Sequence, residues 1–267
     1  MHDSDVTEAR RPSPHVARAA RVPGEPAWIT FDRHLFHLGW LFGAIGAVAA
    51  FPFVVTHPHL PPDPEGVMRT VRDFDAWLLI HVGLMFVLPM MLIGLLAIAR
   101  SIRDERTSAS AAAAMVIAVL GTIFAILGQG VDGVGFNIAA NVYEASPPED
   151  RGAAVLMSVG VAGVAVGIFV LVLFFYFGFT SLAFGIVFLR TRGYPKLIAA
   201  LALLGGGLGL AAAFITYFDD FSDFVYYWLF IPSAVIFLLW VLAASIHVWW
   251  TQVRPHQQEA TSGSAAS

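Results

Sequence analysis

The sequence predicts an all-α, polytopic membrane protein, a bundle of six transmembrane helices with both termini in the cytoplasm. Three observations favour this fold class: the composition, the number of long apolar segments and the division of arginine among the connectors. Of the 267 residues, 58% are hydrophobic and only 13% are charged. A soluble domain has roughly 25% charged residues, so this chain has too few charges to cover a water-facing surface.

Six segments reach the length that a membrane-spanning helix requires, about 20 predominantly apolar residues. They define a transmembrane domain over residues 31–252 and cover residues 35–55, 76–99, 111–131, 153–189, 197–217 and 225–250. The third segment is expected to continue as helix to about residue 144. The flanking residues 1–30 and 253–267 are predicted to be disordered cytoplasmic tails.

The fourth segment is longer than a bilayer requires, because its 37 residues form a straight helix of roughly 55 Å. The third and fourth helices are therefore predicted to form a long antiparallel hairpin that extends outward beyond the membrane. A break near residues 175–180 would create a seventh span, but its second piece is too short.

The positive-inside rule orients the predicted helices. Twelve of the 15 lysine and arginine residues precede the first span, follow the last, or lie in the connectors after the second and fourth spans. The other three, Arg69, Arg72 and Arg151, lie on the opposite side. A multi-pass plasma-membrane protein with cytoplasmic termini is therefore expected. Its arginine-, alanine- and glycine-rich composition indicates a bacterial source.

Composition also excludes several classes of function. The chain has no cysteine, which rules out disulfide scaffolds, thiolate metal sites and cysteine nucleophiles. Its formal net charge of −4 offers no basic surface, so nucleic acid is not an expected partner. The expected partner is the lipid bilayer.

Polar residues at membrane depth gather on the outer half of the predicted bundle, and such residues are costly unless they serve a purpose. We expect five of them to line an outward-facing, ligand-binding pocket: His81, Gln129, Asp132, Asn137 and Asn141. The competing interpretation is a third helix that has left the bilayer and become amphipathic there. The pocket predicts a protein without covalent chemistry that binds or passes a small cationic or neutral ligand.

A divalent metal is the one cofactor that the sequence suggests. One candidate ligand set is His57 and His59, in a connector of ordinary turn composition (HPHLPPDPEG), together with His81. The other is Asp219, Asp220 and Asp223 in the DDxxD pattern. Imidazole and carboxylate together suit zinc, and carboxylates spaced by four residues can share a hard cation. This alternative predicts a metal-dependent membrane enzyme acting on a lipid-linked substrate at the outer leaflet. His37 and His247 leave a bis-imidazole haem as a further alternative.

Three glycine pairs have the GxxxG spacing that lets helices approach closely: Gly39/Gly43, Gly163/Gly167 and Gly205/Gly209. Packing within the bundle is the first interpretation. The other is a homo-oligomer or a structural subunit that binds a partner protein through these faces.

The segment FLRTRGYPKLIAALALLGGGLG, residues 188–209, resembles a signature in bacterial multi-pass membrane proteins that share a domain of unknown function. The resemblance covers the last four spans. It implies a six-helix or similar bundle and assigns neither an activity nor a catalytic residue.

Overall fold

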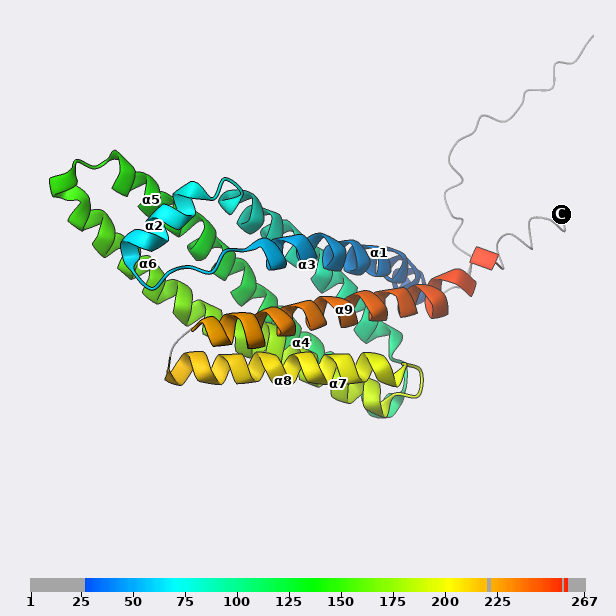
Figure 1. The fold of residues 1–267 in the computed structure, drawn as a ribbon. Helices are drawn as coiled ribbons and strands as arrows, with labels where there is room; N and C mark the ends of the chain where they lie inside the picture. The colour runs from blue at the N-terminus through cyan, green and yellow to red at the C-terminus, as the bar shows by residue number, and fades with distance from the viewer. Residues whose placement is uncertain (1–26, 220–221, 256, 259–267) are drawn as a thin grey trace, which may run out of the picture.

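The structure, a computed structural model, describes residues 27–219, 222–255 and 257–258. Within these residues it contains helices and no strands (Figure 1). Six of its helical stretches are long and apolar enough to cross a membrane. The predicted all-α bundle of six transmembrane helices is thereby confirmed.

The six stretches are built from the following elements. The first two are single helices, α1 (Ala27–Thr56) and α3 (Trp77–Ser101). The third joins α4 (Glu105–Gln129), a π-helical segment η1 (Gly130–Gly135) and α5 (Phe136–Ala145). The fourth joins a 3₁₀ turn η2 (Pro148–Asp150), α6 (Arg151–Leu171), a π-helical segment η3 (Val172–Phe179) and α7 (Thr180–Arg190). The last two are α8 (Lys196–Phe218), and α9 (Ile231–Val248) between the π-helical segments η4 (Val225–Phe230) and η5 (Trp249–Val253).

The boundaries of the outermost helices differ from the expected ones. Residues 1–26 of the predicted amino-terminal tail and 259–267 of the carboxy-terminal tail lie outside the described residues. Ala27 already belongs to α1, so this helix begins before the predicted boundary at residue 31. The beginning of α1 and the end of α9 lie at the same end of the bundle (Figure 1), where α1 contacts η5.

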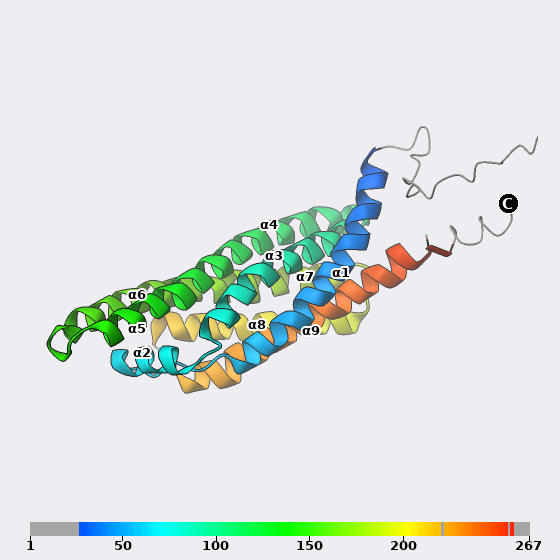
Figure 2. The same cartoon turned by 90° about the horizontal axis from the view of Figure 1, so that it is seen from above.

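The third and fourth stretches form the predicted long hairpin. They have 41 and 43 residues, against 23 to 29 for the other four, and a helix of about 40 residues is roughly 60 Å long, twice the hydrocarbon thickness of a bilayer. Figure 2 shows α5 and α6 projecting beyond the ends of α8 and α9.

A short helix, α2 (Pro64–Asp73), occupies the connector after α1, where the composition had indicated a turn. Its start has a local cause: the Asp63 carboxylate caps the helix by accepting a hydrogen bond from the Gly66 amide at 2.6 Å, and Pro64 takes the first helical position. Its apolar side packs against the extended hairpin in a cluster of Val67, Met68, Val71, Trp77, Phe136 and Ala140. On this side, α2 covers the part of the hairpin that projects.

Two of the three glycine pairs serve packing inside the bundle. A Cβ atom on Gly39 would lie 2.2 Å from the Ala97 side chain, and one on Gly209 would lie 3.0 Å from the backbone of Gly178. For Gly163 and Gly167, no described atom lies within 4 Å of such a Cβ. The Gly163/Gly167 pair therefore faces away from the bundle, and the homo-oligomer stays a prediction.

Candidate functional site

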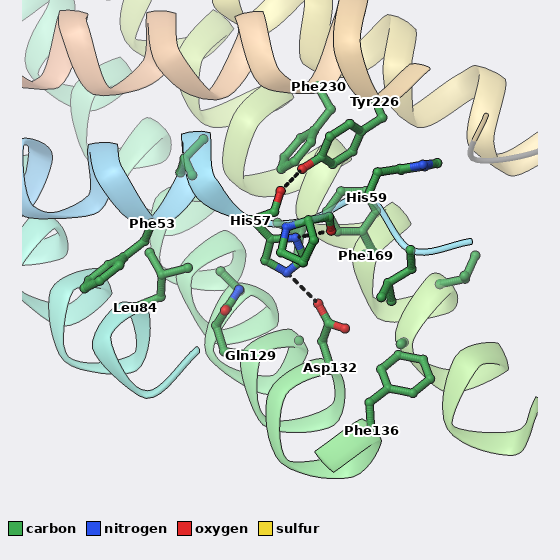
Figure 3. Close-up of a pocket in the computed structure, with 18 of the residues that line it drawn as sticks. Phe53, His57, His59, Leu84, Gln129, Asp132, Phe136, Phe169, Tyr226 and Phe230 are labelled. Atoms are coloured by element: carbon green, nitrogen blue, oxygen red, sulfur yellow. Dashed lines mark hydrogen bonds and ion pairs between the residues drawn. The ribbon is translucent and has the colours of Figure 1, made fainter. Parts of the chain in front are cut away.

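Three side chains from distant parts of the chain meet where α1, α3 and η1 come together. The Nε2 atoms of His57 and His81 are 3.2 Å apart. The Asp132 Oδ2 atom is 3.2 Å from Nε2 of His81 and 3.6 Å from Nε2 of His57. Figure 3 shows His57 and Asp132 facing one another across the edge of a cavity. Among the histidine, aspartate and glutamate side chains of the described residues, these three form the one potential metal-binding group, with ligand atoms that all lie within 4.8 Å of one another.

Local structure positions each of these residues. His57 is the first residue after α1, and its carbonyl oxygen accepts a hydrogen bond from the Tyr226 hydroxyl at 2.5 Å. His81 lies one turn inside α3 and is fully buried. Asp132 lies in η1, where the wider π-helical turn directs its side chain into the site; single π-helical turns are frequent at functional sites.

Gly133 lets η1 approach α3 closely. A Cβ atom at this position would lie 2.3 Å from the Cβ atom of His81, far inside van der Waals contact. The Gly133 carbonyl oxygen also accepts a hydrogen bond from the Trp77 indole at 2.9 Å. Glycine is therefore required at the residue next to Asp132 to bring the carboxylate to the imidazole.

The hydrogen bonds of the two rings fix their tautomers. Nδ1 of His81 lies 2.7 Å from the Trp77 carbonyl oxygen, and Nδ1 of His57 lies 2.9 Å from that of Pro58. A carbonyl oxygen can only accept, so both Nδ1 atoms carry hydrogen and donate. In a neutral ring the Nε2 atom then presents a lone pair. With both rings neutral, two lone pairs and a carboxylate oxygen converge without a donor between them, an arrangement that calls for a metal ion or a proton.

The dimensions of the triangle suit a transition-metal ion. Zinc bonds to imidazole nitrogen and carboxylate oxygen at roughly 2.0–2.2 Å, which puts tetrahedral ligand atoms about 3.3 Å apart. The three distances in the site, 3.2, 3.2 and 3.6 Å, bracket this value. Backbone carbonyls that hold the far nitrogen of each ring are also the usual outer partners of metal-binding histidines. The residues present therefore fit zinc or a similar ion with three protein ligands.

A cavity of about 690 Å³ is lined by two of these side chains, His57 and Asp132, and His81 is buried beside them. His57, Gln129 and Asp132 form its polar end, and the rest of the wall is mainly apolar (Figure 3). The Oε1 atom of Gln129 is buried without a hydrogen-bond partner among the described residues. An unsatisfied buried amide oxygen at the edge of a cavity is available to a bound molecule.

The other predicted pocket residues lie apart from this cavity. Asn137 is half-buried and Asn141 is exposed, and neither lines it. In an uninterrupted α-helix, Asn137 and Asn141 would share one half of the circumference with Gln129 and Asp132. The wider turn of η1 changes the angular phase of every residue after it. The sequence contains no signal for this interruption beyond four closely spaced glycines, Gly128, Gly130, Gly133 and Gly135.

The other predicted metal ligands are also separated. The His59 ring pairs with the Asp223 carboxylate, with Nδ1 and Oδ1 2.9 Å apart, and neither residue belongs to the His57–His81–Asp132 triangle. Asp219 is exposed at the end of α8, and Asp220 lies outside the described residues. Of the three histidines proposed as ligands, His57 and His81 meet with Asp132, and His59 does not join them.

The remaining histidine pair, His37 and His247, makes separate contacts in the structure, and the haem alternative stays a prediction. His37 Nδ1 hydrogen-bonds the Arg33 carbonyl on its own helix, and the His247 ring packs on Tyr194 with ring centroids 4.5 Å apart. Each ring has a structural partner of its own.

No protein-family model, curated protein or solved structure matches this chain. The resemblance of residues 188–209 to bacterial membrane proteins with a domain of unknown function stays a prediction, and the function is inferred from the geometry of the site.

Proposed function

We propose that this protein is a metal-dependent membrane enzyme that binds a divalent transition-metal ion, of the zinc type, through His57, His81 and Asp132. The observation that carries the proposal is the convergence of three acceptor atoms, two of them on side chains that line a cavity. A site with three protein ligands and an open position is typical of catalytic zinc, whereas structural zinc is held by four. Such an ion supplies a Lewis acid and an activated water when it is bound.

The chain's own residues complete the site. The backbone carbonyls of Trp77 and Pro58 orient the two rings, and the amide of Gln129 offers a buried polar contact to a molecule in the cavity. The apolar wall excludes water from the rest of the cavity, which strengthens the interaction of the metal with a bound group. A substrate would place its reacting group beside the metal and its apolar part along the wall.

Metal analysis of the purified protein tests the proposal. We expect one zinc ion per chain after the detergent-solubilised protein is incubated with zinc and excess metal is removed. Replacement by cobalt should give the visible absorption of a tetrahedral or five-coordinate site with nitrogen and oxygen ligands. Protein that stays free of stoichiometric zinc, cobalt, manganese or nickel under these conditions would contradict the proposal.

A second candidate function follows from the same three acceptors. A proton held between the rings and the carboxylate would also satisfy them, and the cavity would then bind or pass a small cationic or neutral ligand in exchange with protons. The metal analysis separates the two candidates, because a protonated site leaves the purified protein without metal.

The proposed orientation puts both termini in the cytoplasm and the metal site at the outer leaflet of a bacterial plasma membrane. The arginine-rich connectors support it: Arg100 closes α3 and Arg190 closes α7, at the end of the bundle where α1 begins. A cysteine added near the carboxy terminus of this cysteine-free chain should resist a membrane-impermeant maleimide in intact cells, and one added at Ser146 should react. The reverse labelling pattern would overturn the orientation.

A further inference from the structure

The cavity continues far beyond the metal-binding triangle. Along α3 it reaches Met91, ten residues after His81, which is about 15 Å at 1.5 Å per residue. Along α1 it reaches Ala50 and along α4 it reaches Ala125, both seven residues from the triangle. A depth of about 15 Å is half of the hydrocarbon core of a bilayer, the length that one acyl chain occupies in its leaflet.

The walls of this deep part are hydrophobic. They consist mainly of phenylalanine and aliphatic side chains: Phe53, Leu88, Phe169, Val172, Phe230 and Phe237. The Tyr176 hydroxyl also reaches it but is directed to the Met91 sulfur at 3.8 Å. A long apolar ligand finds complementary surface here, and a small polar ligand would leave most of the cavity wall without a partner.

One wall separates the cavity from the lipid-facing surface of the bundle. Val159 and Val166 of α6 line the cavity, yet they are 49% and 47% exposed. The same side chains therefore face the cavity and the surroundings of the bundle, and these surroundings are acyl chains in a membrane. A lipid chain can reach the cavity along α6 without passing through water.

The charges near the cavity favour a carboxylate or an ester carbonyl over a phosphate. No lysine or arginine lines the cavity among the described residues. Arg69 is engaged with Asp63 and Glu65, and the guanidinium of Arg72 donates to Asp73 at 2.7 Å, which lowers the pKa of that carboxyl. A divalent ion with one carboxylate ligand keeps one positive charge, which suits a single oxygen anion or a polarised carbonyl.

We propose that the cavity binds a long-chain fatty acyl group from the membrane, with its carboxylate or ester carbonyl at the metal and its chain along α3 towards Phe237. This inference rests on the proposed function, because the metal holds the polar end of the ligand. It adds the class of the ligand and the position of its chain.

Two hydroxamate probes of different length test the inference on the cobalt-loaded, full-length protein. Acetohydroxamate reaches only the metal, and dodecanohydroxamate adds a chain; binding of either changes the visible spectrum of cobalt. The variant Ala125→Phe fills the deep part of the cavity, and Ala113→Phe is the matched control, because Ala113 lies on the same helix and is exposed. The ratio of the two affinities is compared between proteins, so that partition of the long probe into detergent cancels.

We expect Ala125→Phe to bind acetohydroxamate as the wild type does and to reduce the relative affinity for the long probe at least about tenfold, because a ring occupies the space of the chain. Ala113→Phe should leave the ratio unchanged. Gly128→Leu is the second variant: a Cβ on Gly128 meets Ile168 at an ordinary 3.5 Å, so a side chain fits there and extends into the cavity.

An unchanged ratio in both filled variants, or tighter binding of dodecyl phosphate than of the long hydroxamate, would overturn the acyl assignment while the metal site stands. Failure of the wild type to take up cobalt, or of acetohydroxamate to alter its spectrum, would instead count against the proposed function.

Discussion

Asp132→Asn is expected to abolish stoichiometric metal binding, with an affinity at least about 100-fold lower than that of the wild type. The substitution preserves the shape of the side chain but removes its charge and one of its two acceptor oxygens. Changes to outer partners of metal ligands already cost about 10–100-fold in affinity, and loss of a ligand should cost no less. His81→Ala, which removes the most buried of the three ligands, should have the same effect.

The stability of the metal-free protein gives this prediction a second readout. Without a metal ion, and at alkaline pH where neither Nε2 atom carries a proton, the Asp132 carboxylate faces two lone pairs. The amide group that replaces this carboxylate in the variant would instead donate hydrogen bonds to the Nε2 atoms, each worth about 1 kcal/mol. At this pH we therefore expect metal-free Asp132→Asn to unfold at a higher temperature than the metal-free wild type. Zinc at about 100 times its dissociation constant should stabilise the wild type by about 2.7 kcal/mol and leave the variant unchanged.

His59→Ala is the matched control, because His59 also lines the cavity but pairs with Asp223 outside the triangle. It should keep its metal and the stabilisation by zinc. Metal content and thermal unfolding in detergent, with and without zinc, measure all of these variants. Full zinc occupancy in both Asp132→Asn and His81→Ala would show that the triangle is not the metal site.

Gly133→Ala is expected to reduce metal affinity and stability together, because the added methyl group has no room. The methyl carbon would lie 2.3 Å from Cβ and 2.5 Å from Cγ of His81. These two atoms are the part of the His81 side chain nearest to the backbone, and they cannot move aside by a change of rotamer alone. The segment η1 must therefore move away from α3, which separates Asp132 from His81 and weakens the hydrogen bond from Trp77. Overpacking of this kind costs roughly 1–3 kcal/mol, and we expect at least a tenfold loss of metal affinity.

Gly160→Ala is the control, because no described atom lies within 4 Å of a Cβ at that position on α6. Alanine is favoured over glycine inside a helix by up to about 1 kcal/mol, so this variant should be as stable as the wild type or more so, with unchanged metal content. The two variants are compared by thermal unfolding and zinc titration. Equal behaviour of both would mean that the close approach of η1 to α3 does not position the site.

The metal-binding triangle was only partly predictable from the sequence. His57, His81 and Asp132 were each recognised as polar groups at the outer half of the bundle, where burial of such groups is costly. The sequence places Asp132 in the ligand pocket alone, and it groups His57 and His81 with His59 as metal ligands, because His57 and His59 are close along the chain. The chain separation is 24 residues from His57 to His81 and 51 from His81 to Asp132, so no local pattern relates them.

The class of this protein follows from its amino-acid sequence alone. The length and hydropathy of each segment reflect the cost of exposing polar backbone to lipid, and this local requirement yields six spans and the long hairpin. The site, in contrast, is a product of tertiary packing. Which faces of α1, α3 and η1 meet depends on close contacts such as that of Gly133 with His81. The π-helical turn that carries Asp132 accepts a hydrogen bond from the Trp77 indole of α3 at the Gly133 carbonyl. Hydrophobic periodicity along one helix does not encode such a contact between helices.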